Sequence, residues 1–106
     1  MKLLWSKFAV EELKEIFDYY KENAGIPIAN RLRKKIFNST RQLKTQPKSG
    51  QIEPSLNRMN EKHRYLVRGN YKVIYKEVEE GILITDIFDT RQNPSKINNP
   101  ERKSGR

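Results

Sequence analysis

The stretch RYLVRGNYKVIY, residues 64–75, consists of two short runs of alternating side chains separated by the pair Gly69-Asn70. A Gly-Asn pair favours the positive φ angles that a two-residue turn between antiparallel strands requires. The stretch therefore predicts a tight β-hairpin, whose register places Arg68 opposite Tyr71 and Arg64 opposite Tyr75.

The turn also decides which side chains share a face, because directly opposed residues point to the same side of a sheet. The face with the larger apolar side chains is expected to pack on the core; it carries Leu66, Tyr71, Val73 and Tyr75, with Arg64 and Arg68. The other face is half polar and predicts an exposed platform for a phosphate backbone, with one tyrosine for stacking. An ordinary solvated sheet face is the alternative. This second face carries His63, Tyr65, Val67, Lys72, Ile74 and Lys76.

The segments on either side of the hairpin predict a further strand and a long loop. Residues 82–88 are rich in β-branched side chains and predict a strand that follows a turn at 79–81. Residues 45–62 are polar and interrupted by proline and glycine, so they predict a long loop with room for one helical turn near 56–59. Long loops inside small domains are often functional.

The N-terminal part predicts a short strand and two helices. Residues 2–5 form the strand. Ser6 can cap a first helix over which apolar residues recur at helical spacing, and Gly25 can end that helix. Pro27 suits the first turn of a second helix, which continues to about Lys44.

The predicted order is therefore β-α-α-β-β-β. This is an α+β fold in which an N-terminal helical hairpin packs on an antiparallel sheet. We expect a single domain over residues 1–97 and a polar C-terminal tail over residues 98–106.

The positive charge of the chain is concentrated in one segment. The 106 residues have a formal net charge of +9, and residues 26–50 contain seven lysines and arginines and no acidic residue. Such a segment favours a polyanionic partner: nucleic acid, the ribosome or an acidic protein. For any single residue the simpler interpretation is a solvated helix face, on which lysine stems cover apolar surface.

Composition excludes several kinds of site. The sequence has no cysteine and only one histidine, so a disulfide framework, a thiolate or multi-histidine metal site and a cysteine nucleophile are all excluded. Asp86 and Asp89 lie three apart on a predicted strand and should point to opposite faces, which argues against a shared metal. Asp89 is expected instead to cap the turn at Thr90-Arg91 or to pair with Arg91. We expect no metal and no cofactor.

No apolar run approaches the ~20 residues that span a bilayer. The N-terminal start is too short and too soon charged for a secretory signal. We therefore expect a cytoplasmic protein with no membrane partner.

Three segments together resemble one known family. They are the strand with the helix that reads EELKEIFDYY at 11–20, the hairpin at 64–75, and IFDTRQNP at 87–94. In this order they are similar to the RelE/ParE superfamily of type II toxin–antitoxin systems, and the last is typical of its ParE branch. The resemblance implies a toxin that is held silent by an antitoxin, whose extended segment wraps it in a hetero-oligomer.

The superfamily has two activities, and the residues favour one of them. RelE-like members cut mRNA in the ribosomal A site without a metal; ParE-like members inhibit DNA gyrase. The two strand lysines of the RelE pattern fall on His63 and Tyr65 here, its later arginines on Lys72 and Arg91, and its C-terminal tyrosine near Ile97. Lysine lacks the bidentate phosphate grip of arginine, and isoleucine cannot transfer a proton. These departures favour the ParE branch.

We therefore predict a ParE-like toxin that inhibits DNA gyrase by direct binding, is more plausibly a non-catalytic inhibitor than an enzyme, and is neutralised by a cognate antitoxin. The alternatives are a RelE-like, ribosome-dependent mRNA endoribonuclease and an inactive antitoxin-binding member. A ribonuclease would use His63, Lys72 and Arg91, although a lone histidine is more often structural. The predicted surface for the target or nucleic acid comprises Arg64, Tyr65, Arg68, Lys72, Lys76 and Arg91. The predicted antitoxin-binding residues are Arg31, Lys34, Lys35 and Arg41.

Overall fold

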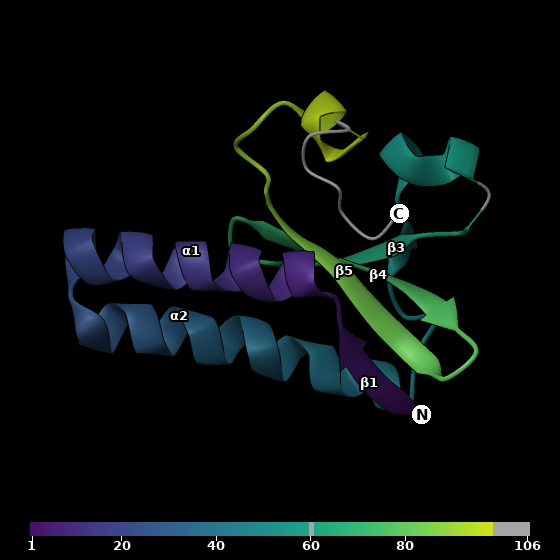
Figure 1. Ribbon diagram of the computed structural model, residues 1–106, viewed down its shortest axis with the longest axis horizontal. Helices are drawn as coiled ribbons and strands as arrows, with labels where there is room; N and C mark the ends of the chain where they lie inside the picture. The colour runs from purple at the N-terminus through teal and green to yellow at the C-terminus, as the bar shows by residue number, and fades with distance from the viewer. Residues whose placement is uncertain (60, 99–106) are drawn as a thin grey trace.

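Figure 1 shows the computed structural model, which describes residues 1–59 and 61–98. Two long helices lie side by side next to a sheet, and two short 3-10 segments lie together above it. The predicted α+β class is confirmed. Residues 99–106, most of the predicted tail, lie outside the described residues. The elements are β1 (Lys2–Trp5), α1 (Lys7–Ala24), α2 (Ile26–Ser39), η1 (Thr40–Lys44), β2 (Gln51–Ile52), η2 (Pro54–Met59), β3 (Arg64–Arg68), β4 (Tyr71–Val78), β5 (Gly81–Asp89) and η3 (Pro94–Asn98).

The helical hairpin begins and ends where the sequence predicts. The Ser6 hydroxyl accepts a hydrogen bond of 3.0 Å from the backbone N–H of Ala9, which satisfies one of the free donors at the start of α1. Gly25 ends α1 with a φ of 94°, and proline follows in the first turn of α2. The second helix is α-helical only to Ser39 and continues to Lys44 as the 3-10 segment η1.

The hairpin register is confirmed at every pair, from Arg64 opposite Tyr75 to Arg68 opposite Tyr71. The face predicted to pack on the core does so. Burying each large apolar side chain contributes about 1.5–3 kcal/mol, so this layer holds the helices on the sheet. The main core contains Ala9, Ile36, Leu43, Leu66, Tyr71, Val73, Tyr75, Ile82, Ile84 and Ile87.

The sheet is mixed, in the order β1-β5-β4-β3-β2. Strands β2 to β5 are antiparallel, but β1 runs parallel to β5, with Lys2 opposite Gly81. Parallel neighbours require a long crossover, and here nearly the whole domain lies between the two strands. The short strand β2, paired with the start of β3, occupies part of the predicted loop.

A β-bulge in β5 changes which of its side chains face the helices. The register shifts between Ile74 and Tyr75, whose partners are Asp86 and Ile84, so Thr85 is the extra residue. Because of this insertion, Ile84 and Ile87 both reach the main core although they lie three residues apart. Asp86 points to the opposite face, on the side of Ile74.

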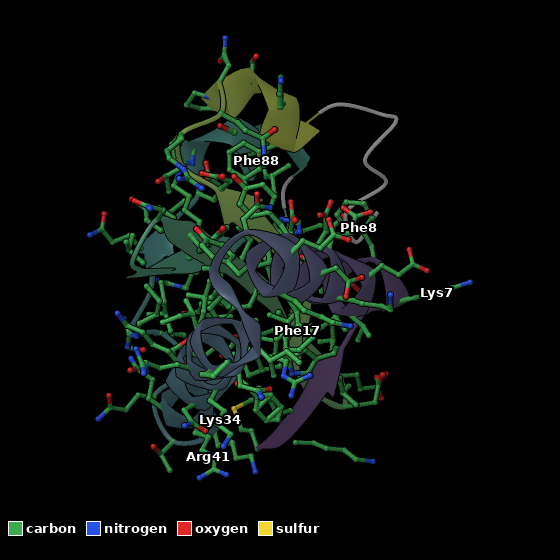
Figure 2. All side chains as sticks on the ribbon, turned by 90° about the vertical axis from the view of Figure 1, so that its left-hand side faces the viewer. Lys7, Phe8, Phe17, Lys34, Arg41 and Phe88 are labelled. Carbon is green, nitrogen blue, oxygen red and sulfur yellow. The ribbon has the colours of Figure 1, made fainter. Side chains whose placement is uncertain are left out.

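The prediction of an exposed platform on that opposite face was wrong over much of its area. Ile74 is fully buried and His63 is 1% exposed. The cause is a second apolar cluster, in which Leu56 of η2 and Ile97 of η3 pack on Ile74 and Phe88. Figure 2 shows Phe88 near η3, at the far end of the molecule from α2. Short 3-10 turns have no apolar periodicity, so the sequence did not indicate that these segments cover the sheet.

Candidate functional site

The three residues of the ribonuclease hypothesis do not meet at one point. Lys72 is paired with Val67 on the face covered by η2. His63 continues the register beside Lys76, about 13 Å along the strand from that pair. Arg91 lines a cavity on the other side of the sheet, against α1. In this arrangement the three side chains are too far apart to act together on one phosphate.

Lys72 is held by two neighbours on the covered face. Its ammonium lies 2.6 Å from Oε1 of Glu53, and 4.2 Å from the centre of the Tyr65 ring. The Glu53 side chain is fully buried, and its second oxygen accepts a hydrogen bond of 2.9 Å from the N–H of Ser55. Lys72 therefore acts as the counter-ion that lets a carboxylate stay buried under η2.

The imidazole of His63 is buried, although its backbone carbonyl accepts a hydrogen bond of 2.8 Å from the N–H of Glu53. Within residues 1–59 and 61–98, neither ring nitrogen has a hydrogen-bond partner. Burial lowers the pKa of His63, and the positive charge of Lys76 lowers it further, while Glu61 and Glu53 act in the opposite direction. Lys76 itself pairs with Glu61. This environment favours a neutral imidazole with a structural role over a solvent-accessible base.

Arg91 forms the predicted pair with Asp89. Its guanidinium donates to both carboxylate oxygens, at 2.9 and 2.8 Å, and its backbone N–H donates to Oδ1 at 2.9 Å. These bonds hold the pKa of Asp89 below its usual range. Burial and contact with Tyr20 raise the pKa of Tyr71, so its phenol stays protonated. Arg91, Asp89 and Tyr71, together with Glu12 of α1, line a cavity of about 380 Å³.

Arg64 binds the hairpin to the loop before β2, and Arg68 binds it to η1. Arg64 donates a hydrogen bond of 2.8 Å to the carbonyl of Gly50, and Arg68 donates one of 2.9 Å to the Gln42 side chain. The six residues of the predicted target surface are therefore distributed over both faces of the sheet and do not form one patch. Arg91 is the most exposed of them.

The cations of the predicted antitoxin site lie on one element and its continuation. Arg31, Lys34 and Lys35 are exposed on α2, and Arg41 is exposed on η1. Figure 2 shows Lys34 and Arg41 on the outer side of this helix, away from the sheet. No acidic residue occurs between residues 26 and 52, so no nearby segment of this helix supplies a counter-ion.

The part of the chain that the structure describes contains no group of three or more histidine or acidic side chains arranged to hold a metal ion. In the same part, no helix is long and apolar enough to cross a bilayer.

Comparison with known protein families matches residues 3–94 to the family described as ParE toxin of the type II toxin–antitoxin system parDE. The chain belongs to the ParE toxin family. Comparison with curated proteins gave no match. Among solved structures, a chain of the chromosomal ParDE toxin–antitoxin system from P. aeruginosa is similar, with a TM-score of 0.68 and 20% identity. The similarity covers 84% of this chain and 95% of that one, and at this identity it concerns the fold.

Sequence reasoning missed two features of this ParE-family chain. The first is Glu53, whose signal was present: it is the first acidic residue after the acid-free stretch, directly before a proline. The second is the contact of Trp5 with Phe37, whose rings stack 5.8 Å apart between β1 and α2. No local pattern relates these two, because the contact depends on how the helical hairpin folds back on the first strand.

Proposed function

We propose that this chain inhibits DNA gyrase by binding it directly, without chemistry of its own, and that a cognate antitoxin neutralises it in the cytoplasm. The observation that carries the proposal is the match of residues 3–94 to the ParE toxin family. The separation of His63, Lys72 and Arg91 supports an inhibitor over a ribonuclease, because cleavage requires acid, base and phosphate-binding groups within reach of one bond.

The gyrase part is tested with a supercoiling assay, using folded toxin without antitoxin and scoring both lost supercoiling and trapped, cleaved DNA. Inhibition at a near-stoichiometric ratio of toxin to gyrase is the expected result. Full supercoiling with folded toxin in tenfold excess would contradict it. Assaying mRNA cleavage on programmed ribosomes with the same preparation then tests the ribonuclease alternative.

Within the predicted target surface, Arg91 is the residue to change first. Truncation at this residue would also remove Ile97, which is buried in the second cluster, and so would confuse binding with folding. Arg91→Ala leaves that cluster intact and is expected to weaken gyrase inhibition at least tenfold. Lys96→Ala, another exposed cation from the same segment, is the matched control and should inhibit like the unchanged protein.

The antitoxin, as an acidic partner, is proposed to contact four exposed cations: Arg31, Lys34, Lys35 and Arg41. Their support is the net charge of the segment and the absence of any acid within it. A complex of this kind should weaken as salt is raised, because exposed charge pairs are screened. Titration of toxin with antitoxin at 50 and 300 mM salt measures this dependence.

A further inference from the structure

A hollow lies between β1, the end of α2 and η1, and its volume is about 360 Å³. Trp5 and Phe37 form its aromatic wall, with ring planes only 10° apart. Phe37 is 44% exposed and Met1, which also lines the hollow, is 57% exposed. We call this hollow the Trp5–Phe37 groove. Its volume is at the lower end of the ~300–1,000 Å³ typical of ligand sites, which suits one or two inserted side chains.

The rim of the groove is entirely cationic. Lys2, Arg41 and Lys44 line it, and no carboxylate does. Within residues 1–59 and 61–98, none of these three forms an ion pair, whereas Lys72, Lys76 and Arg91 each have a carboxylate partner. The groove therefore combines exposed apolar surface with uncompensated positive charge.

This combination selects the chemistry of the partner. An apolar side chain gains by leaving water in the hollow, and carboxylates flanking it gain by approaching the three cations. A nucleic-acid backbone would instead require cations spaced along a track, and an apolar hollow offers nothing to a phosphate. The features favour an acidic peptide that carries a large apolar residue.

We propose that the Trp5–Phe37 groove is the anchoring point for an acidic segment of the antitoxin, with one large apolar side chain inserted and carboxylates on Arg41 and Lys44. The proposal rests on the antitoxin partnership proposed above and adds a location and a mode of binding. Of the four cations proposed above for the antitoxin contact, Arg41 lines the groove, and Arg31, Lys34 and Lys35 lie outside it.

The binding test uses the cognate antitoxin, purified by itself, and titrates it into three toxin variants. Phe37→Ala removes one of the two rings of the aromatic wall, and Arg41→Glu with Lys44→Glu reverses the charge of two of the three rim cations. Each is expected to raise the Kd at least tenfold. Lys7→Glu with Lys21→Glu is the matched control, since it reverses the charge of two exposed cations on α1 that do not line the groove. It should change the Kd less than threefold.

A second readout reports the groove directly. The chain has one tryptophan, Trp5, so 5-fluorotryptophan gives a single ¹⁹F resonance from the aromatic wall. Saturating antitoxin is expected to shift this resonance in the unchanged protein. Binding without a shift overturns the groove as the anchoring point.

The remaining outcomes separate the two proposals. If the antitoxin binds the unchanged toxin and all variants alike, the groove proposal fails while the antitoxin partnership stands. If the control pair weakens binding as much as the rim pair, general charge explains the complex and the groove proposal fails. If a DNA duplex displaces the antitoxin and loses its own binding in the rim variant, the groove is a phosphate site. If the antitoxin does not bind the folded toxin at all, both proposals fail.

Discussion

The ammonium of Lys72 lies 2.6 Å from Oε1 of Glu53, a carboxylate that is completely buried. The sequence had suggested this lysine as a phosphate ligand. In the structure it neutralises the acid directly before η2, and its own side chain is only 19% exposed. A change at Lys72 therefore acts first on folding, so a loss of toxicity in such a variant is no sign of catalysis.

Replacing Lys72 by Met should lower the free energy of unfolding by about 2–4 kcal/mol, because it leaves a buried charge without its partner. Glu53→Gln in the same background removes that charge and should restore part of the loss. Urea denaturation of the two single variants and the double variant measures the coupling. Additive single effects would mean that the pair contributes nothing to stability.

The environment of His63 predicts a pH-dependent stability. Its pKa is lowered in the folded state, mainly by burial and then by Lys76, while Glu61 and Glu53 oppose the shift. The unfolded chain, with a pKa of about 6.5, then binds more protons than the folded chain between the two pKa values. Stability should be fully present above pH 7.5 and fall as the pH decreases through 6.5.

Urea midpoints at pH 7.5 and 5.5 test this dependence against His63→Leu. In the variant, the midpoints at pH 7.5 and pH 5.5 should be nearly equal, because no titrating group remains at position 63. An equal difference in both proteins would assign the effect to other groups.

The parts of the fold that could be predicted depend on neighbours in sequence. The pair Gly69-Asn70 determined the register of five residue pairs, since a two-residue turn permits only one alignment. The parallel direction of β1 could not be predicted, because its partner β5 lies at the other end of the chain. The bulge at Thr85 could not be predicted either, since no residue near it indicates that the strand contains an extra residue.

The candidate site was harder to predict for the same reason. The pair of Asp89 with Arg91 was expected, because the two residues lie two positions apart. The contact of Glu53 with Lys72 was not, because it joins a loop to a strand nineteen positions away. Counting cations along the sequence therefore overstated how many are free to bind a partner.

The hydroxyl of Tyr75 should stabilise the loop that precedes β2, because it forms two hydrogen bonds there. This buried hydroxyl donates to the carbonyl of Pro47 at 2.8 Å and accepts from the N–H of Gly50 at 2.9 Å. Tyr75→Phe leaves the Gly50 N–H without an acceptor, which should cost about 1–3 kcal/mol. Amide exchange at Gly50 should become faster. Tyr19→Phe, at a residue that is 59% exposed, is the control and should leave both quantities unchanged.

Adding a single methyl group at Gly81 should cause a large loss of stability. Gly81 begins β5 directly opposite Lys2, and a Cβ added there would overlap the Lys2 carbonyl oxygen. Its φ of 149° adds backbone strain for any other residue, of order 1–3 kcal/mol. Gly81→Ala should therefore separate β1 from β5 and lower the free energy of unfolding by more than about 3 kcal/mol.

Gly69→Ala is the matched control for this prediction. Gly69 also has a positive φ, of 59°, but an added Cβ there meets nothing within 4 Å. The substitution should cost only the conformational penalty of about 1–2 kcal/mol. The fluorescence of Trp5, the last residue of β1, distinguishes the two variants, because only release of β1 exposes its ring. Equal stability losses, or an unchanged Trp5 signal in Gly81→Ala, would show that the β1–β5 contact tolerates a side chain and that strain alone determines the cost.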